Sequence, residues 1–110
     1  MKVVDNPAID VVFTGGGRPS DPSLLTKEII GAAENTTQEM SPGVVVLPTM
    51  TTGATDGAKV RNAGIPTYGV SGLFVDRNDV RAHGSDERLL VKSFYEGYEF
   101  MYRLIRKLSS

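Results

Sequence analysis

The apolar residues of this chain occur in short runs that are separated by segments rich in glycine, proline and serine. The first run, "IDVVFT" at residues 9–14, predicts one short strand. It is followed by "GGGRPSDPS", which is typical of a linker or of a crossing between domains. Because no partner hairpin precedes or follows this strand, we expect it to be the end of a preceding unit and the polypeptide to continue upstream.

After the linker the pattern acquires a helical period. Asp21 followed by Pro22 predicts a helix start, because a carboxylate caps free N–H groups and proline suits the first helical position. The predicted helix runs from Pro22 to Met40 and is ended by the sequence "SPG". Its apolar stripe consists of Leu25, Ile29, Ala32 and Ala33.

Four more elements complete the predicted order. Residues 44–50, "VVVLPTM", are an uninterrupted, largely β-branched run that predicts a buried strand. A loop and a two-turn helix at residues 58–64, closed by its final glycine, lead to a second predicted strand at residues 65–72. The last helix is predicted over residues 91–108. This alternation favours an α/β layer with parallel strand pairing.

The last helix carries an apolar stripe at helical spacing. A recognition surface is one interpretation of such a stripe. Far more often a stripe of this kind is buried, and we predict that it belongs to the core. Its members are Val91, Phe94, Tyr95, Tyr98, Met101, Tyr102 and Ile105.

Composition excludes several classes of protein. Twelve basic and thirteen acidic residues give a net charge of −1, so we expect no nucleic-acid partner. The absence of cysteine excludes a disulfide scaffold and a zinc finger. No apolar run approaches the roughly 20 residues of a membrane span, and we expect no membrane partner. A chain of 110 residues is the size of one small domain.

One junction between strand and helix is a candidate anion site. In "PTMTTGATDGAKV" a strand enters a loop rich in glycine and threonine, where backbone N–H groups and the helix dipole suit an anion. The alternative is an ordinary turn in which Asp56 caps the helix, and the local pattern by itself favours this alternative. The loop lacks the Gly-Lys-Ser/Thr ending of a P-loop, so a carboxylate is at least as suitable a ligand as a phosphate.

The chain contains a single histidine, His83, in the charged sequence "RAHGSDER". Imidazole is the commonest zinc ligand, and the neighbouring Asp86 and Glu87 are placed to orient the ring. The alternative is a solvated loop of ordinary surface composition, which the residues alone favour. One histidine supplies one of about four ligands, so this chain does not close a zinc site by itself.

From residue 44 onward, the order of motifs resembles the C-terminal end of a known family. The motifs "TTGATDG", "NAGIP" and "HGSDE" occur in the order and spacing of the dinuclear zinc metallopeptidases and amidohydrolases, which include aminoacylase, carnosinase, the Gly-X carboxypeptidases and succinyl-diaminopimelate desuccinylase. Each motif is weak alone, but their combination is specific. Residues 44–108 carry the resemblance, and residues 1–43 fit it more loosely.

The resemblance implies a fold and an activity. Residues 17–110 would be the C-terminal part of an α/β/α catalytic domain, and residues 1–16 would be the last strand of an inserted lid or dimerisation domain with the start of the linker. The full-length protein would use two zinc ions to hydrolyse amide bonds of small peptides or N-acyl amino acids, and it would form a homodimer. A swapped or non-native dimer is the corresponding expectation for the fragment.

The resemblance also implies residue roles. His83 would be a metal ligand, and Asp56 and Glu87 would be structural or supporting residues. The family's other metal ligands and its catalytic glutamate belong to the N-terminal half, so we expect no catalytic residue in this chain and no activity from it alone. The residues expected to bind the substrate carboxylate are Thr51, Thr52, Gly53, Ala54 and Thr55.

One alternative function remains at this point. The chain would be a stand-alone small α/β module that binds a phosphate or carboxylate through residues 51–57, as a monomer and without zinc. A structural remnant left by cleavage at the linker is a third interpretation, and it is compatible with the family resemblance. That remnant would expose the apolar face that the missing half of the domain covers.

Overall fold

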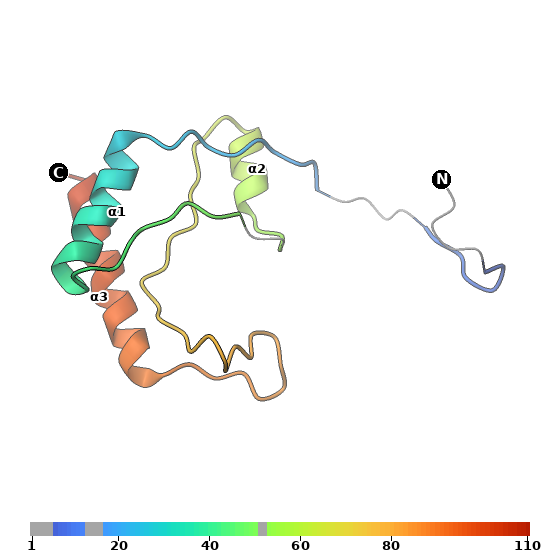
Figure 1. Ribbon diagram of the computed structural model, residues 1–110. Coiled ribbons are helices and arrows are strands. Elements are labelled where there is room, and N and C mark those ends of the chain that lie inside the picture. The colour runs from blue at the N-terminus through green and yellow to red at the C-terminus, as the bar shows by residue number, and fades with distance from the viewer. Residues whose placement is uncertain (1–5, 13–16, 51–52) are drawn as a thin grey trace.

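Three helices make up the regular structure of the residues that are described. The computed structural model describes residues 6–12, 17–50 and 53–110, with helices α1 (Lys27–Met40), α2 (Gly57–Asn62) and α3 (Val91–Leu108). Helices α1 and α3 pack side by side, whereas α2 lies apart from them and the N-terminal segment extends away from all three (Figure 1). In the part of the chain that is described, no helix is both long and apolar enough to cross a membrane.

Helix α1 begins at Lys27 and not at Pro22, so the predicted start was wrong. Thr26 is the N-cap, and its hydroxyl accepts a hydrogen bond from an amide of the first turn at 3.3 Å. Ser23 is engaged elsewhere, because its hydroxyl accepts from the amide of Thr67 at 2.8 Å and donates to the carbonyl of that residue at 3.1 Å. This contact between distant segments keeps the residues before Thr26 out of the helix.

Helix α2 ends close to the predicted position. It spans Gly57–Asn62, and Gly64 follows it with a φ of +86°. The amide of Gly64 donates to the carbonyl of Arg61 at 2.8 Å. Glycine adopts this left-handed conformation at little cost, which is why the chain can turn sharply there into the next segment.

Helix α3 has the predicted bounds, Val91–Leu108, and it packs against α1 through one narrow face. Ala33 of α1 lies 6% exposed, and Leu104 of α3 is 3% exposed. No buried polar side-chain atom of the described residues lacks a hydrogen-bond partner. The buried residues of α3 are Ser93, Gly97, Phe100 and Leu104.

Charged side chains tie the ends of α1 and α3 together. Glu39 of α1 accepts a hydrogen bond from Lys107 of α3 at 2.7 Å, and its other oxygen lies 3.8 Å from Arg103. The hydrogen bond from Lys107 and the charges of both basic residues lower the pKa of Glu39. Because these side chains are a third to a half exposed, we expect the ion pairs to contribute little to the stability of the helix pair.

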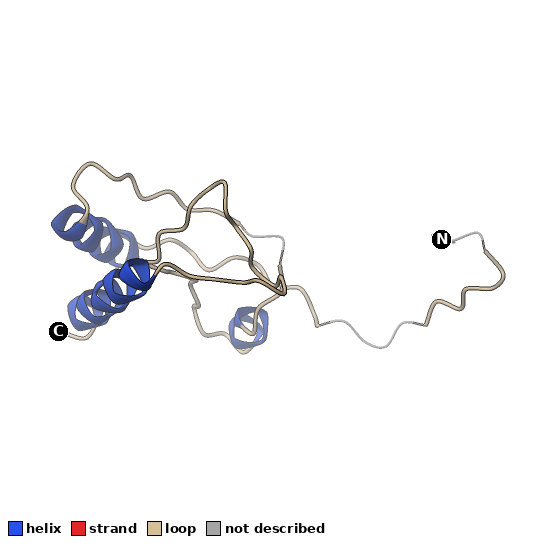
Figure 2. Ribbon diagram, turned by 90° about the horizontal axis from the view of Figure 1, so that it is seen from below, coloured by secondary structure: helices blue, strands red, loops and turns tan. Residues whose placement is uncertain are grey.

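The two central strands that the sequence predicted do not form. Residues 44–50 and 65–72 run as extended chain between the α1–α3 pair and α2, and the described residues contain no strand (Figures 1 and 2). A strand exists only when its backbone groups pair with a neighbouring strand. Here the amide and the carbonyl of Thr67 both bond to the hydroxyl of Ser23 instead. Of the first predicted strand, residues 9–12 are extended without pairing, and residues 13–14 lie outside the described residues.

The predicted stripe of α3 is exposed except at Met101, which is partly buried and packs against the core, so its prediction as core was wrong for the other six residues. Tyr95 is 67% exposed and Tyr98 is 68% exposed. Helix α3 has a second apolar face, which contains Phe100 and Leu104, and α1 contacts that face instead. Which face of α3 is buried depends on which one packs against α1, and the periodicity of the α3 sequence alone does not predict this.

The chain is more open than a compact domain of its size. Its radius of gyration is 18.5 Å, compared with about 13 Å for a compact domain of this length. Its accessible surface is 9752 Å², whereas a compact monomer of this mass exposes about 5,900 Å². Extended segments and the uncovered stripe of α3 account for this excess. The described core consists of Ala33, Phe100 and Leu104.

We expect Gly72→Ala to destabilise the chain by about 1–3 kcal/mol, because core overpacking has that cost. A Cβ atom at Gly72 would lie 2.4 Å from the Cβ of Phe100, which cannot move without shifting α3. The matched control is Gly31→Ala inside α1, where an added Cβ meets no atom within 4 Å. This control should stabilise the chain by about 0.5–1 kcal/mol through helix propensity. Urea unfolding followed by circular dichroism measures both, and an unchanged midpoint for Gly72→Ala would contradict the close approach to α3.

Candidate functional site

His83 lies on a loop, residues 76–88, that leads from the second extended segment into α3. The loop is a series of tight turns: the amide of Gly84 donates to the carbonyl of Arg81 at 3.0 Å, and the amide of Glu87 donates to the carbonyl of Gly84 at 3.2 Å. His83 has a φ of +64°, in the left-handed region that few non-glycine residues adopt. Its side chain is exposed to solvent.

Two aspartates and two arginines on either side of His83 form a cluster of ion pairs within this loop. Oδ2 of Asp79 accepts hydrogen bonds from Nε of Arg88 at 3.0 Å and from Nη2 of Arg88 at 2.5 Å. Arg81 donates to Oδ1 of Asp79 and also to the carboxylate of Asp86. The hydrogen bonds from Arg81 and Arg88 lower the pKa of Asp79. The cluster therefore joins the two ends of the segment that contains His83.

The acidic neighbours of His83 take part in the loop in ways that the sequence did not predict. The carboxylate of Asp86 was expected to orient the imidazole, but it binds Arg81. Glu87 enters the hydrogen bonding of the loop through its backbone amide. Among the described residues, no hydrogen bond or ion pair reaches the imidazole of His83.

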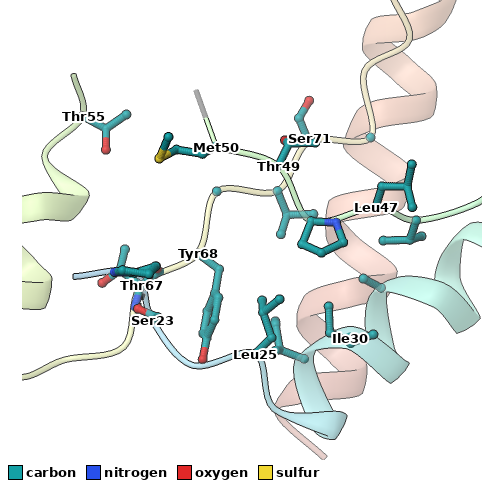
Figure 3. A pocket seen from close by; sticks show the side chains of 18 of the residues that line it. Ser23, Leu25, Ile30, Leu47, Thr49, Met50, Thr55, Thr67, Tyr68 and Ser71 are labelled. Carbon is teal, nitrogen blue, oxygen red and sulfur yellow. Dashed lines mark hydrogen bonds between the residues drawn. The ribbon is translucent and has the colours of Figure 1, made fainter. Parts of the chain in front are cut away.

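A hollow of about 1940 Å³ lies between the α1–α3 pair, α2 and the extended segments. Figure 3 shows Ile30 and Leu47 on its helical side and Thr55, Ser23 and Thr67 on the opposite side, with Tyr68 between the two sides. Pockets that bind one small molecule have volumes of about 300–1,000 Å³. The hollow is therefore larger than a site for one ligand, because unpaired extended segments surround it.

The predicted substrate loop lines one end of this hollow. Gly53, Ala54, Thr55 and Asp56 contribute to its wall, whereas Thr51 and Thr52 lie outside the described residues. The Thr55 hydroxyl accepts from the amide at the start of α2 at 3.2 Å, and so it performs the capping that was expected of Asp56. The carboxylate of Asp56 instead pairs with exposed Lys59 at 3.0 Å.

The structure does not bring the predicted site residues together. The loop at Gly53–Asp56 faces the hollow, but neither His83 nor Glu87 contributes to its wall. Nor do the described residues contain a group of three or more His, Cys, Asp or Glu side chains that could hold a metal ion.

Sequence reasoning missed the residues that organise both regions. In the loop, Arg88 donates a hydrogen bond to Asp79, which lies nine positions earlier in the sequence. At the hollow, Arg61 donates to the hydroxyl of Ser20 at 2.8 Å and to the carbonyl of Thr67 at 3.3 Å, and so it connects the linker with the second extended segment. The sequence shows opposite charges within the "RNDVRAHGSDER" segment. A loop has no regular spacing of side chains, however, so the sequence does not predict which of these charges pair. Only the folded chain shows which charges meet.

A family model for peptidase family M20/M25/M40 matches residues 6–107. The chain belongs to this family. The resemblance seen in the motifs is therefore confirmed at the level of the family. Membership in the M20/M25/M40 family suggests an α/β peptidase fold, although the residues described here form helices and unpaired extended segments.

One curated relative is similar to most of this chain. The chain is similar to the Probable carboxypeptidase S-like 2 of Dictyostelium discoideum, with 29% identity over 89 residues. The matched region covers 80% of this chain and 17% of the relative. The chain thus spans less than a fifth of the length of the curated relative that it matches.

M20/M25/M40 peptidases are generally metal-dependent. The described residues include a side chain of a type that binds metal ions, but too few such side chains lie together to complete a metal site. His83 offers an exposed imidazole, which is a suitable donor. A bound metal needs about three or more protein ligands, and the described residues contain no such group. The described residues therefore do not form a metal centre by themselves.

Proposed function

We propose that this chain supplies the C-terminal part of a zinc-dependent peptidase or amidohydrolase that releases amino acids from small peptides or N-acyl amino acids. The observation that carries the proposal is the family match, which extends over both the Thr/Gly loop and His83. The name of the relative, which is carboxypeptidase S-like, supports a substrate with a free terminal carboxylate.

In this proposal, His83 is one metal ligand, and the remaining ligands and the catalytic residues come from polypeptide outside the chain. Residues 51–55 bind the substrate carboxylate through backbone N–H groups and hydroxyls. Residues 17–110 belong to the catalytic domain, and residues 1–16 end the lid or dimerisation domain of a homodimer. The exposure of His83 supports a role that needs further ligands from outside this chain.

The experiment is an assay of the full gene product on dipeptides and N-acetyl amino acids. We expect release of free amino acid that disappears after dialysis against a chelator and returns with Zn²⁺. A C-terminal carboxamide substrate is the matched control, and it should react about 10–100-fold more slowly because it loses a charged hydrogen-bonding group. The 110-residue chain alone should show no hydrolysis. Absence of hydrolysis by the metal-loaded full product would contradict the proposal, and chelator-resistant hydrolysis would contradict its dependence on zinc.

A further inference from the structure

The conformation of the His83 turn requires support from its surroundings. A positive φ is uncommon outside glycine, although histidine is among the residues that adopt it most readily, and neighbouring contacts help to hold such a conformation. The adjoining hydrogen bond, from the amide of Gly84 to the carbonyl of Arg81, closes a single turn. Beside the backbone hydrogen bonds of the loop, charged side chains bridge the two sides of this turn.

Asp79 is the side chain with the contacts to do this. It binds Arg81, which precedes the turn, and Arg88, which follows it, so one carboxylate connects both sides of His83. Its amide also donates to the carbonyl of Asp76 at 3.0 Å, which fixes its own position. Hydrogen bonds between charged groups are stronger than those between neutral groups, and Arg88 donates two of them to one oxygen of Asp79.

Asp86 is less well placed for this role. It contacts Arg81 alone and is 62% exposed at its side chain, compared with 32% for Asp79. An exposed pair is screened by water and contributes little. The loss of Asp86 would leave the link between Arg88 and the start of the loop intact, whereas the loss of Asp79 would remove it.

We propose that Asp79 is a positioning residue for His83: by binding Arg81 and Arg88 together, it closes the loop and holds the backbone from which the imidazole projects. The consequence for catalysis rests on the proposed function, in which His83 is a metal ligand. The closure of the loop does not depend on that function and is tested separately.

The first test is NMR spectroscopy of the 110-residue chain, in which His83 is the only histidine and its ring signal needs no further assignment. In Asp79→Asn, we expect several-fold faster amide exchange at Gly84 and a shifted, averaged His83 ring signal, while the α3 signals stay unchanged. Asp21→Asn, which removes the same charge outside the loop, is the control and should match the wild type. Asp86→Asn should have the smaller effect of the two loop variants.

A second variant keeps this test decisive if Asp79→Asn disturbs the α3 signals. Arg88→Gln breaks the same link from its other side and should reproduce the faster exchange at Gly84. Unchanged exchange at Gly84 in both variants would overturn the proposal.

The second test measures catalysis by the full gene product. We expect Asp79→Asn to lower kcat about 10–100-fold, the usual cost of losing a partner that orients a metal ligand, with KM nearly unchanged. Asp79→Glu, which keeps the carboxylate, should restore part of the activity. A looser loop with unchanged kcat would overturn the positioning role. If His83→Ala itself retained activity, the assignment of His83 as a ligand would fail, and the NMR result would still decide whether Asp79 closes the loop.

Discussion

If His83 is a metal ligand, as we propose, its replacement by alanine in the full gene product is expected to lower kcat/KM for amide hydrolysis by more than about a hundredfold. The physical reason is that the loss of a metal ligand exceeds the loss of a residue that merely orients one, which typically costs 10–100-fold. The bound zinc content, measured by atomic absorption after gel filtration, should fall in parallel. His83 is exposed, so its replacement should leave the free energy of unfolding unchanged within about 0.5 kcal/mol.

Asn78→Ala is the matched control for this variant. Asn78 lies on the same loop, and the structure records a hydrogen bond from its backbone amide to Asp76, which alanine retains. Its activity and zinc content should equal those of the wild type. Full activity and full zinc content in His83→Ala would contradict the assignment of the histidine as a ligand.

The second large effect concerns stability. Phe100→Ala in the 110-residue chain should reduce the free energy of unfolding by about 3–5 kcal/mol, the usual cost of truncating a buried phenylalanine. Phe100 is 8% exposed and contacts both the core of the α1–α3 pair and the segment at Gly72. Because small domains have a total stability of only about 5–15 kcal/mol, this one change should remove a large fraction of the helical signal at moderate urea concentrations.

Tyr98→Ala on the same helix is the control for Phe100→Ala. Tyr98 is 68% exposed, and its replacement should change the free energy of unfolding by no more than about 0.5 kcal/mol. A cost equal to that of Phe100→Ala would mean that the aromatic stripe is the buried face of α3, as its spacing predicted. The same pair of variants in the full gene product would report whether further polypeptide covers the stripe.

Local features of the chain were predictable where their cause is local. The bounds of α3 follow from eighteen residues that form one continuous amphipathic pattern, and the end of α2 follows from a glycine that can turn left-handed. The start of α1 was wrong because Ser23 bonds to Thr67, and a contact between distant positions leaves no mark in a local pattern.

The candidate site shows the same division. The motifs around the Thr/Gly loop and His83 identified the family, because the order of motifs can be read from the sequence without knowledge of the fold. The bracketing of His83 by Asp79 and Arg88 was not predicted, because several charges in that loop are plausible partners for one another. Which charges pair depends on turns that only the folded loop defines.

By itself, the sequence determined the family, the existence of three helices and the full extent of the last one. The family was predicted from the order of motifs, and the helices from the helical periodicity of single segments. Neither prediction requires knowledge of which distant segments come into contact. Only the tertiary structure decided that α1 contacts the Phe100 face of α3 and leaves Tyr98 exposed. It also decided that residues 44–50 and 65–72 stay unpaired, because a β-strand is completed by hydrogen bonds to a neighbouring strand and not by its own residues.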